Sequence, residues 1–236
     1  MRVLVTRPEP DAIHTAALLA GLGHEPVFAP LIELRFLPGP DVDLTGVQAL
    51  LATSSNGVRA LSRRSRGRDL PVFAVGQQTR ATALGEGFAS VVSADGDSSA
   101  LANLVHRSLK PEAGVLLHVT AREAPAVLCR TLSDFGFEVR TEVLYETPAV
   151  QTLPKSAELG IRTGTIDAVL LFSARTAEVF RMRVGDAGLS QYCSGIRAIC
   201  ISRTAADALK GLAFRQLSIA SAPNQEALLA ALGRGG

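Results

Sequence analysis

Residues 2–7 read Arg2-Val3-Leu4-Val5-Thr6-Arg7, and a stretch of the same kind, Val115-Leu116-Leu117-His118-Val119-Thr120, begins near the middle of the chain. A helix-like stretch follows each of them, then a glycine, Gly23 or Gly136, and then a second apolar run. Two later pairs of segments also match, 51–56 with 170–175 and 72–79 with 197–204. The period is about half the chain, far above the roughly 20–50 residues of solenoid repeats. The sequence therefore predicts a duplicated domain, with a ligand site between the two copies as the first place to look.

The bulk composition fits two globular domains. The chain has 236 residues, of which 47% are hydrophobic and 19% are charged. Two domains of about 110–120 residues can each bury a core at this composition. The net charge of +2 is too weak for a general nucleic-acid or membrane binder. It would suit a small anionic ligand if the arginines converge.

The cysteines and the N-terminus indicate a cytoplasmic protein. The three cysteines, Cys129, Cys193 and Cys200, form no CxxC pair, which argues against a disulfide framework or a structural zinc site. We expect each to be a buried, small apolar residue. The chain opens directly on a strand-like run, without a basic segment and apolar core typical of a signal peptide. No stretch approaches the roughly 18 apolar residues of a membrane span.

Short apolar runs alternate with helix-periodic stretches along the whole chain. The predicted strands are 2–6, 26–34, 48–53, 71–75, 90–93, 115–119, 138–146, 167–172, 197–201 and 216–220. The predicted helices are 9–22, 56–65, 77–86, 98–108, 123–135, 174–183, 203–211 and 224–232, and residues 151–165 fit either a polar helix or a loop. The strands lack strict polar alternation, which is typical of strands covered on both faces. The order therefore predicts an α/β fold of two similar domains, each a parallel sheet flanked by helices.

Two long strand candidates, 26–34 and 138–146, occupy equivalent places in the repeats and break this pattern. Pro26 and Pro30 cannot donate to a strand ladder, so the first segment is no ordinary central strand. Each repeat could form one domain. Alternatively, these two segments pair as a two-stranded β linker, and the chain crosses between the domains on each. The periodicity leaves both arrangements open.

Polar residues gather at the predicted strand-to-helix turns. In open α/β sheets, ligands bind at this edge, where helix N-termini offer free N–H groups to anions. An arginine lies in or beside several of these turns, and arginine holds carboxylates through its planar fork. Helix capping alone would also explain the Ser, Thr and Asn residues. The candidate substrate-binding residues are Thr6, Arg7, Ser54, Ser55, Asn56, Gly57, Thr79, Arg122, Ser173, Arg175, Ser202, Arg203 and Thr204.

Several motifs are absent from the sequence. No GxGxxG, P-loop or GxSxG is present, and no His, Cys and Asp cluster has metal-ligand spacing. His118 lies inside an apolar run and is expected to be a core residue, and the arginine-rich run 63–68 is expected to be a solvated loop. Tyr145 lies on the second linker candidate. It could donate a proton to a leaving group, or it could simply pack there.

The chain resembles the uroporphyrinogen-III synthase family from end to end. The resemblance rests on short pieces whose order and spacing match the family. These are residues 3–8, 30–32, 53–58, 74–79, 136–139, 143–147, 172–175 and 222–223. Two pieces depart from the family's pattern. Its second Gly-x-x-Thr turn reads Ser202-Arg203-Thr204-Ala205 here, and its Arg-Gly turn reads Thr120-Ala121-Arg122.

The resemblance implies the crossed-over arrangement. One domain would comprise residues 1–25 plus 148–236, the other residues 35–147, with 26–34 and 138–147 as linker strands. It also implies a cyclising hydro-lyase that takes linear hydroxymethylbilane, inverts its last pyrrole ring, closes the macrocycle and loses water, without metal or cofactor. The family's tyrosine, which is proposed to assist loss of the hydroxyl, matches Tyr145. Its strand-end hydroxyls match Ser54, Thr79 and Ser173.

The expected partner is this small-molecule substrate, with at most a transient contact to the enzyme that supplies it. We expect a monomer that binds neither nucleic acid nor membrane. Two rival functions stay open at this point. One is a two-domain, non-enzymatic binding module for an anionic small molecule. The other is a nucleotide-sugar transferase, for which the chain is short and lacks a glycine-rich nucleotide loop.

Overall fold

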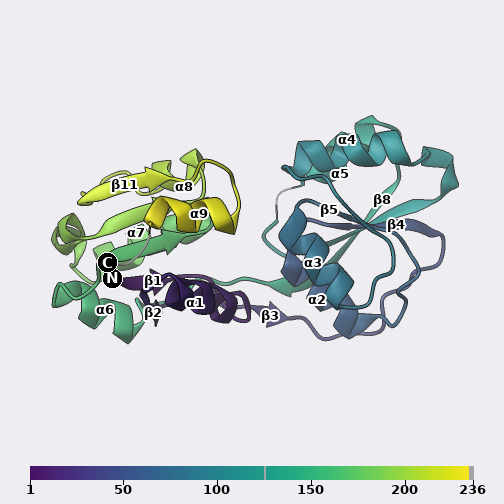
Figure 1. Cartoon of the computed structure of the whole chain (residues 1–236). Coiled ribbons are helices and arrows are strands. Elements are labelled where there is room, and N and C mark those ends of the chain that lie inside the picture. The colour runs from purple at the N-terminus through teal and green to yellow at the C-terminus, as the bar shows by residue number, and fades with distance from the viewer. Residues whose placement is uncertain (125, 234–236) are drawn as a thin grey trace. The chain divides into compact units, whose positions relative to one another are not determined.

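The computed structural model describes residues 1–124 and 126–233, and the chain divides into two compact units (Figure 1). Unit 1 comprises Met1–Leu34 and Pro148–Gly236, and unit 2 comprises Arg35–Thr147. Both termini therefore belong to unit 1.

Unit 1 is built on a parallel sheet with strand order β11-β10-β9-β1-β2. Its strands are β1 (Arg2–Val5), β2 (Glu25–Phe28), β9 (Ala168–Leu171), β10 (Arg197–Cys200) and β11 (Gln216–Ile219). Pro26 lies on β2, which is an edge strand, so its missing N–H removes no bond from the interior of the sheet.

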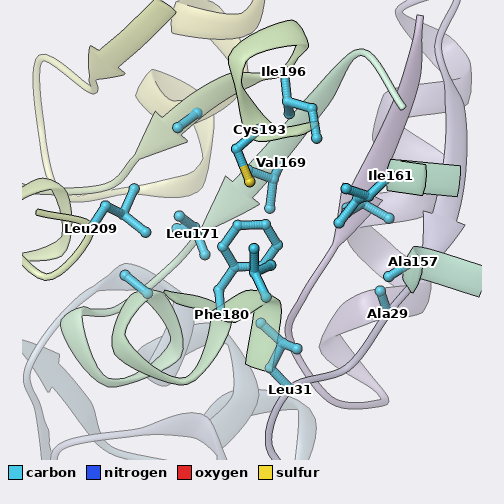
Figure 2. Close-up of a cluster of buried hydrophobic side chains, with 14 of the residues drawn as sticks. Ala29, Leu31, Ala157, Ile161, Val169, Leu171, Phe180, Cys193, Ile196 and Leu209 are labelled. Atoms are coloured by element: carbon cyan, nitrogen blue, oxygen red, sulfur yellow. The ribbon is translucent and has the colours of Figure 1, made fainter. Parts of the chain in front are cut away.

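Helices cover both faces of the unit 1 sheet, as the alternation of side chains along each strand requires. Leu4 and Val169 belong to a core that includes Phe180 of α7 and Cys193 (Figure 2). Val3, Val5 and their neighbours on β9 instead face α1 and α9. The helices are α1 (Asp11–Gly21), α6 (Lys155–Arg162), α7 (Ala174–Asp186), α8 (Arg203–Asp207), α9 (Gln225–Leu232) and the 3-10 helix η2 (Ser190–Gly195).

Unit 2 repeats this architecture with a sheet of order β3-β8-β7-β4-β5-β6, in which all pairs are parallel except β3 with β8. Its strands are β3 (Arg35–Phe36), β4 (Val47–Ala52), β5 (Val72–Ala74), β6 (Val91–Ser93), β7 (Val115–Ala121) and β8 (Val139–Glu146). The helices are α2 (Ser55–Arg64), α3 (Gln77–Gly85), α4 (Ser98–Ser108), α5 (Val127–Asp134) and the 3-10 helix η1 (Pro111–Ala113). Helices α4 and α5 cover one face and α2 and α3 the other (Figure 1).

Apart from the antiparallel edge strand β3, which the sequence did not predict, the two sheets have the same topology, which confirms the predicted α/β fold class. Strands β2-β1-β9-β10-β11 correspond in order to β8-β7-β4-β5-β6. In unit 1, however, β1 pairs with β9, whose residues lie in the second half of the chain. The sequence repeats are therefore not the folding units. Each sheet combines strands from both repeats.

Two short antiparallel pairings lie where the chain leaves one unit for the other. In unit 1, Ile32 pairs with Ala149, and the Glu33 N–H donates to the Pro148 carbonyl at 2.9 Å. In unit 2, Arg35 pairs with Glu146 on β8. This pairing begins later than the first predicted linker strand at 26–34, because residues 25–28 are taken by the parallel edge strand β2.

The predicted elements are present, with local differences at their ends. Gly23 and Gly136 follow α1 and α5 with φ of 81° and 88°, the left-handed conformation that favours glycine after a helix. The cap of α4 is Asp97, whose carboxylate accepts from Ser99 N and Ala100 N. Residues 155–162 form a helix, which the sequence left open.

Helices α5 and α8 are shorter than predicted. Helix α5 begins at Val127 rather than at 123, and α8 ends at Asp207 rather than at 211. Pro125, inside the predicted helix 123–135, lies outside the described residues.

Predictions of burial and of solvent exposure are confirmed at some residues and wrong at others. His118 is 3% exposed, which confirms it as a core residue, whereas Cys129 is only half-buried. Burial raises the pKa of Cys193 and of Cys200 to about 11. The arginine run is not simply solvated, because Arg64 donates to the Pro40 and Leu37 carbonyls and so holds a neighbouring loop.

Candidate functional site

The candidate residues occupy strand-to-helix turns at the carboxyl ends of neighbouring strands in each sheet. In unit 2 these turns follow β5, β4 and β7, and in unit 1 they follow β10, β9 and β1. Three serines cap the helices that start there. Ser54, Ser173 and Ser202 accept the N–H groups of Gly57, Thr176 and Ala205 at 3.2, 3.1 and 3.3 Å. The capping role that the sequence offered as an alternative is therefore present at all three serines.

Ser54 differs from the other two caps because it also contacts a tyrosine. Its Oγ lies 2.7 Å from the hydroxyl oxygen of Tyr145, and the two residues are separated by 91 positions in the chain. Tyr145 lies near the end of β8, where a register shift pairs it with Ala121 of β7. Such an irregularity re-aims side chains. As a result, consecutive residues Leu144 and Tyr145 are both buried, at 1% and 5% exposure.

The environment of Tyr145 keeps its phenol protonated. Burial raises the pKa of Tyr145 above its ordinary value of 10.0, the hydrogen bond with Ser54 lowers it, and the negative charge of Glu123 raises it again. The net shift is upward. At neutral pH the side chain is therefore a hydrogen-bond donor and a weak acid, not a phenolate.

A charged group surrounds the ends of β7 and β8. The Arg122 guanidinium lies 3.2 Å from Glu146, and Arg35 lies 3.9 Å from the same carboxylate. Glu123 accepts from the backbone N–H of Thr147 at 3.2 Å. The side chain of Arg122 is 61% exposed, so its fork can reach a ligand at a small cost in salt-bridge energy.

The sequence missed Glu123 as a site residue. Glu123 directly follows Arg122 in a turn predicted to bind anions. A negatively charged side chain does not fit an anion-binding site, so the sequence offered no reason to include it. Its effect on Tyr145 depends on the packing of β8 beside β7, which no local pattern records.

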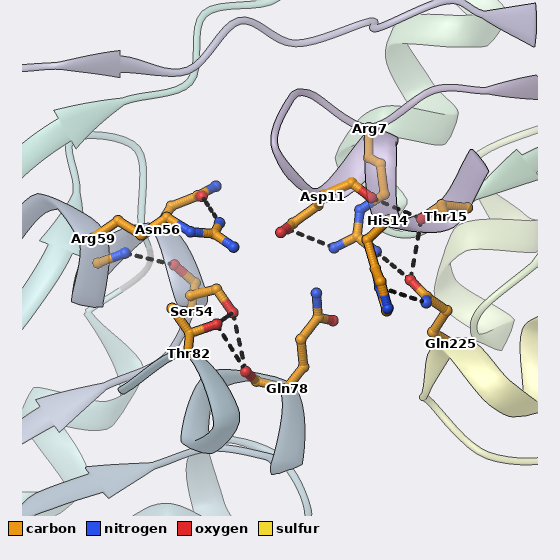
Figure 3. Close-up of polar contacts among 12 residues, drawn as sticks. Arg7, Asp11, His14, Thr15, Ser54, Asn56, Arg59, Gln78, Thr82 and Gln225 are labelled. Atoms are coloured by element: carbon orange, nitrogen blue, oxygen red, sulfur yellow. Dashed lines mark hydrogen bonds and ion pairs between the residues drawn. The ribbon is translucent and has the colours of Figure 1, made fainter. Parts of the chain in front are cut away.

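The first turn of α2 is joined to α3 by hydroxyl groups (Figure 3). Ser55 is buried and receives a hydrogen bond from Thr82 at 3.0 Å, while Thr82 also contacts the Gln78 carbonyl. Asn56 accepts from Arg59 at 2.8 Å. Thr79 is buried at 5% exposure within α3. Of the candidates in these two turns, Ser54 and Asn56 are the partly exposed side chains.

Gly57 serves helix packing. A Cβ at this position would lie 3.0 Å from the Val119 carbonyl oxygen, so only glycine lets α2 approach β7 this closely.

In unit 1, Thr6 and Arg7 are engaged within the fold. The Thr6 hydroxyl is fully buried and donates to the Leu170 carbonyl at 2.6 Å. The Arg7 guanidinium donates to Gln225 and Asp11 at 2.8 and 2.7 Å (Figure 3). It also lies over the Phe172 ring. These contacts join α1 to α9 and leave the Arg7 side chain 13% exposed.

Two other unit 1 candidates, Arg175 and Thr204, line an open groove between α7 and α8. The groove has a volume of about 570 Å³. Its lining also includes the cations Arg181 and Lys210 and the carboxylates Glu178 and Asp207. Ser202 and the exposed Arg203 lie in the turn that begins α8. Among these candidates, Arg175, Arg203 and Thr204 are placed where a carboxylate could reach them.

Residues 1–124 and 126–233 hold no group of three His, Cys, Asp or Glu side chains that could bind a metal ion. In the same ranges no helix is long and apolar enough to cross a membrane.

Comparison with known proteins points to one family. A family profile described as uroporphyrinogen-III synthase HemD matches residues 13–230. A search of curated protein sequences finds no match.

Solved structures share the fold. The uroporphyrinogen-III synthetase of Helicobacter pylori is 20% identical with a TM-score of 0.64, and the alignment covers 97% of this chain and 96% of that one. A mutant uroporphyrinogen III synthase from the extremely thermophilic bacterium Thermus thermophilus is also 20% identical, with a TM-score of 0.58 and coverage of 98% and 96%. At this identity the structural likeness establishes the fold, while the profile match over most of the chain establishes the family. The chain belongs to the uroporphyrinogen-III synthase family.

Proposed function

We propose that this protein converts linear hydroxymethylbilane into uroporphyrinogen III, acting as a cyclising hydro-lyase. The profile match over residues 13–230 carries this proposal. The site fits it, because the buried, protonated hydroxyl of Tyr145 lies beside exposed arginine and helix N-termini at a strand-end edge. The family match disfavours a binding module without chemistry.

The reaction depends on control of the substrate's geometry more than on chemical activation. A hydroxymethylpyrrole loses water readily to an azafulvene, and unassisted closure gives the uninverted isomer. The enzyme must instead direct attack to the substituted carbon of the last ring, giving a spiro intermediate that fragments and recloses. Holding reacting atoms in place can supply this control.

The proposed site residues have two roles, recognition of the substrate and proton transfer. Tyr145 donates a proton to the departing hydroxyl. Arg122 in unit 2, and Arg175, Arg203 and Thr204 in unit 1, bind carboxylates of the substrate, helped by the N-termini of α2 and α7. Thr6, Arg7, Ser55, Gly57 and Thr79 support the fold around the site, because their polar groups or packing are used internally. We expect a cytoplasmic monomer whose only lasting partner is the substrate.

Product analysis tests the function. Freshly generated hydroxymethylbilane is incubated with and without the protein, and the uroporphyrin isomers are separated after oxidation. We expect isomer III with the protein and isomer I without it. Isomer I alone from a folded sample would reject the synthase and leave an anion-binding module as the best remaining function.

Replacing Tyr145 by Phe tests its part in catalysis. Positioned general acids contribute about 10²–10⁴-fold, and the substrate is reactive enough to place this effect at the lower end. We expect Tyr145→Phe to lower kcat by about 10²-fold and to retain isomer III as the product, because folding of the substrate does not depend on the hydroxyl. Steady-state kinetics with isomer analysis measures both. Loss of many orders of magnitude in a folded variant would contradict a mainly conformational mechanism.

A further inference from the structure

The fold determines how many hydroxyl protons of Ser54 and Tyr145 remain available to a ligand. Each hydroxyl carries one proton, and the bond between them, 2.7 Å long, uses one of the two. Among residues 1–124 and 126–233, neither hydroxyl donates to any other group. The pair therefore has one O–H left to give to a ligand.

The first turn of α2 decides which oxygen keeps that proton. The Gly57 N–H donates to Ser54 Oγ at 3.2 Å and polarises its hydroxyl. Accepting a bond from a helix N-terminus makes the serine O–H a better donor. Ser54 is therefore oriented to donate to the tyrosine oxygen, which leaves the phenol proton free.

The other repeat supplies an internal comparison. Ser173 caps α7 with the same backbone conformation as Ser54, but its Oγ lies 2.8 Å from the Thr176 hydroxyl. When the two repeats are aligned on Gly23 and Gly136, Ile32 occupies the position of Tyr145. The cap is thus common to both repeats, while the hydroxyl pair belongs to unit 2. Capping needs the serine, and the fold alone does not need the tyrosine beside it.

We propose that Ser54 is a positioning residue for Tyr145, holding the phenol so that its O–H points to the leaving hydroxyl of the substrate. This inference rests on the proposed function. When the substrate C–O bond breaks, its electrons stay on oxygen and the Tyr145 proton completes a water molecule. The positive charge remains on the azafulvenium. The proton released from the ring carbon when the macrocycle closes returns to the phenolate.

Removal of the Ser54 hydroxyl tests the proposal in activity. Ser54→Ala removes cap and partner together, and Ser54→Gly removes the hydroxyl while glycine still tolerates the cap position. We expect both to lower kcat by about tenfold with KM changed by less than about twofold, because the arginines that bind the substrate carboxylates are unchanged. Ser54→Thr, which keeps cap and hydroxyl, should restore kcat. Asp97→Ala removes the cap of α4 in the same unit and should leave kcat unchanged.

A double variant separates positioning from general damage. If Ser54 acts only through Tyr145, adding Ser54→Gly to Tyr145→Phe lowers kcat no further. Independent, multiplying losses would overturn the proposal, and so would a kcat for Ser54→Gly equal to that of Asp97→Ala.

A spectroscopic measurement tests the pair without any substrate. The chain has two tyrosines and no tryptophan, so incorporation of 3-fluorotyrosine gives one ¹⁹F signal each for Tyr145 and Tyr192. Ser54→Gly should move the Tyr145 signal and raise the pH at which it titrates, while Asp97→Ala should change neither. An unmoved signal would overturn the pairing itself. A moved signal in a protein that makes no isomer III would instead reject the proposed function and, with it, the catalytic part of this inference.

Discussion

His118 is a buried histidine at a place where the other repeat has an apolar residue. Its ring nitrogens lie 3.4 Å from the Cys129 sulfur and 3.5 Å from the Thr53 hydroxyl. The corresponding residue of unit 1 is Val5, which pairs with Leu170 as His118 pairs with Leu51. Burial lowers the pKa of His118 to about 4, against an ordinary value of 6.5. The folded chain therefore holds the ring neutral where the unfolded chain would protonate it.

We expect this histidine to make unit 2 acid-labile. The stability contributed by the neutral ring is fully present above pH 6.5 and is lost as the pH falls towards 4. The slope approaches about 1.4 kcal/mol per pH unit, or about 3 kcal/mol across the range. His118→Val, which copies Val5, should flatten this dependence. Urea unfolding at about pH 7.5 and about pH 4.5 measures it, and equal losses in both proteins would contradict the assignment.

At the scale of elements, the contact of α2 with β7 places the Ser54 cap beside Tyr145. Gly57 allows this contact, since an added Cβ would meet the Val119 carbonyl at 3.0 Å and the Val119 side chain at 3.6 Å. A strand carbonyl in mid-sheet cannot move aside without disturbing its ladder bond. The helix must shift instead, and the cap shifts with it.

Gly57→Ala should therefore destabilise unit 2 by about 1–3 kcal/mol, as overpacking does. It should also lower kcat, because Ser54 leaves its place. Gly85→Ala is the matched control, since Gly85 lies in α3 of the same unit with no atom within 4 Å of an added Cβ. Alanine there should be neutral or stabilising by up to about 1 kcal/mol. Chemical denaturation of both variants measures the difference in the free energy of unfolding. An unchanged value for Gly57→Ala would show that the contact of α2 with β7 has space for a methyl group.

At the scale of the molecule, the folding units cut across the sequence repeats. Unit 2 is one continuous segment whose ends are held together, because Arg35 pairs with Glu146. Unit 1 is assembled from residues at both ends of the chain, since β1 and β2 complete a sheet begun by β9, β10 and β11. A fragment that follows the repeat boundary separates β1 from β9 and leaves this apolar strand paired on one side only, with β2.

We expect residues 35–147 to fold alone, with a cooperative thermal transition and dispersed amide NMR signals. Residues 1–113 should not, because they lack β9 to β11 for unit 1 and β7 and β8 for unit 2. Circular dichroism melts and NMR spectra of both fragments check this. A cooperative transition in fragment 1–113 would mean that the repeat itself is the folding unit.

The sequence alone was enough to predict the elements and the fold class. Runs such as 168–171 and 115–121 are covered on both faces, and burial on both faces makes a strand continuously apolar in the sequence. The serine turns were also recognisable, because capping acts within three residues of the helix start.

Only the tertiary structure decided what each candidate side chain contacts. Thr6 donates to the Leu170 carbonyl and Arg7 donates to Gln225, so two residues predicted to bind a ligand form hydrogen bonds within the fold. Ser54 meets Tyr145 because strands β4 and β8 flank β7 in one sheet. Local patterns record which face of an element is buried, since periodicity is a property of neighbouring residues. The partner of a polar group is set by strands that are distant in the chain, and that information exists only once the sheets have formed.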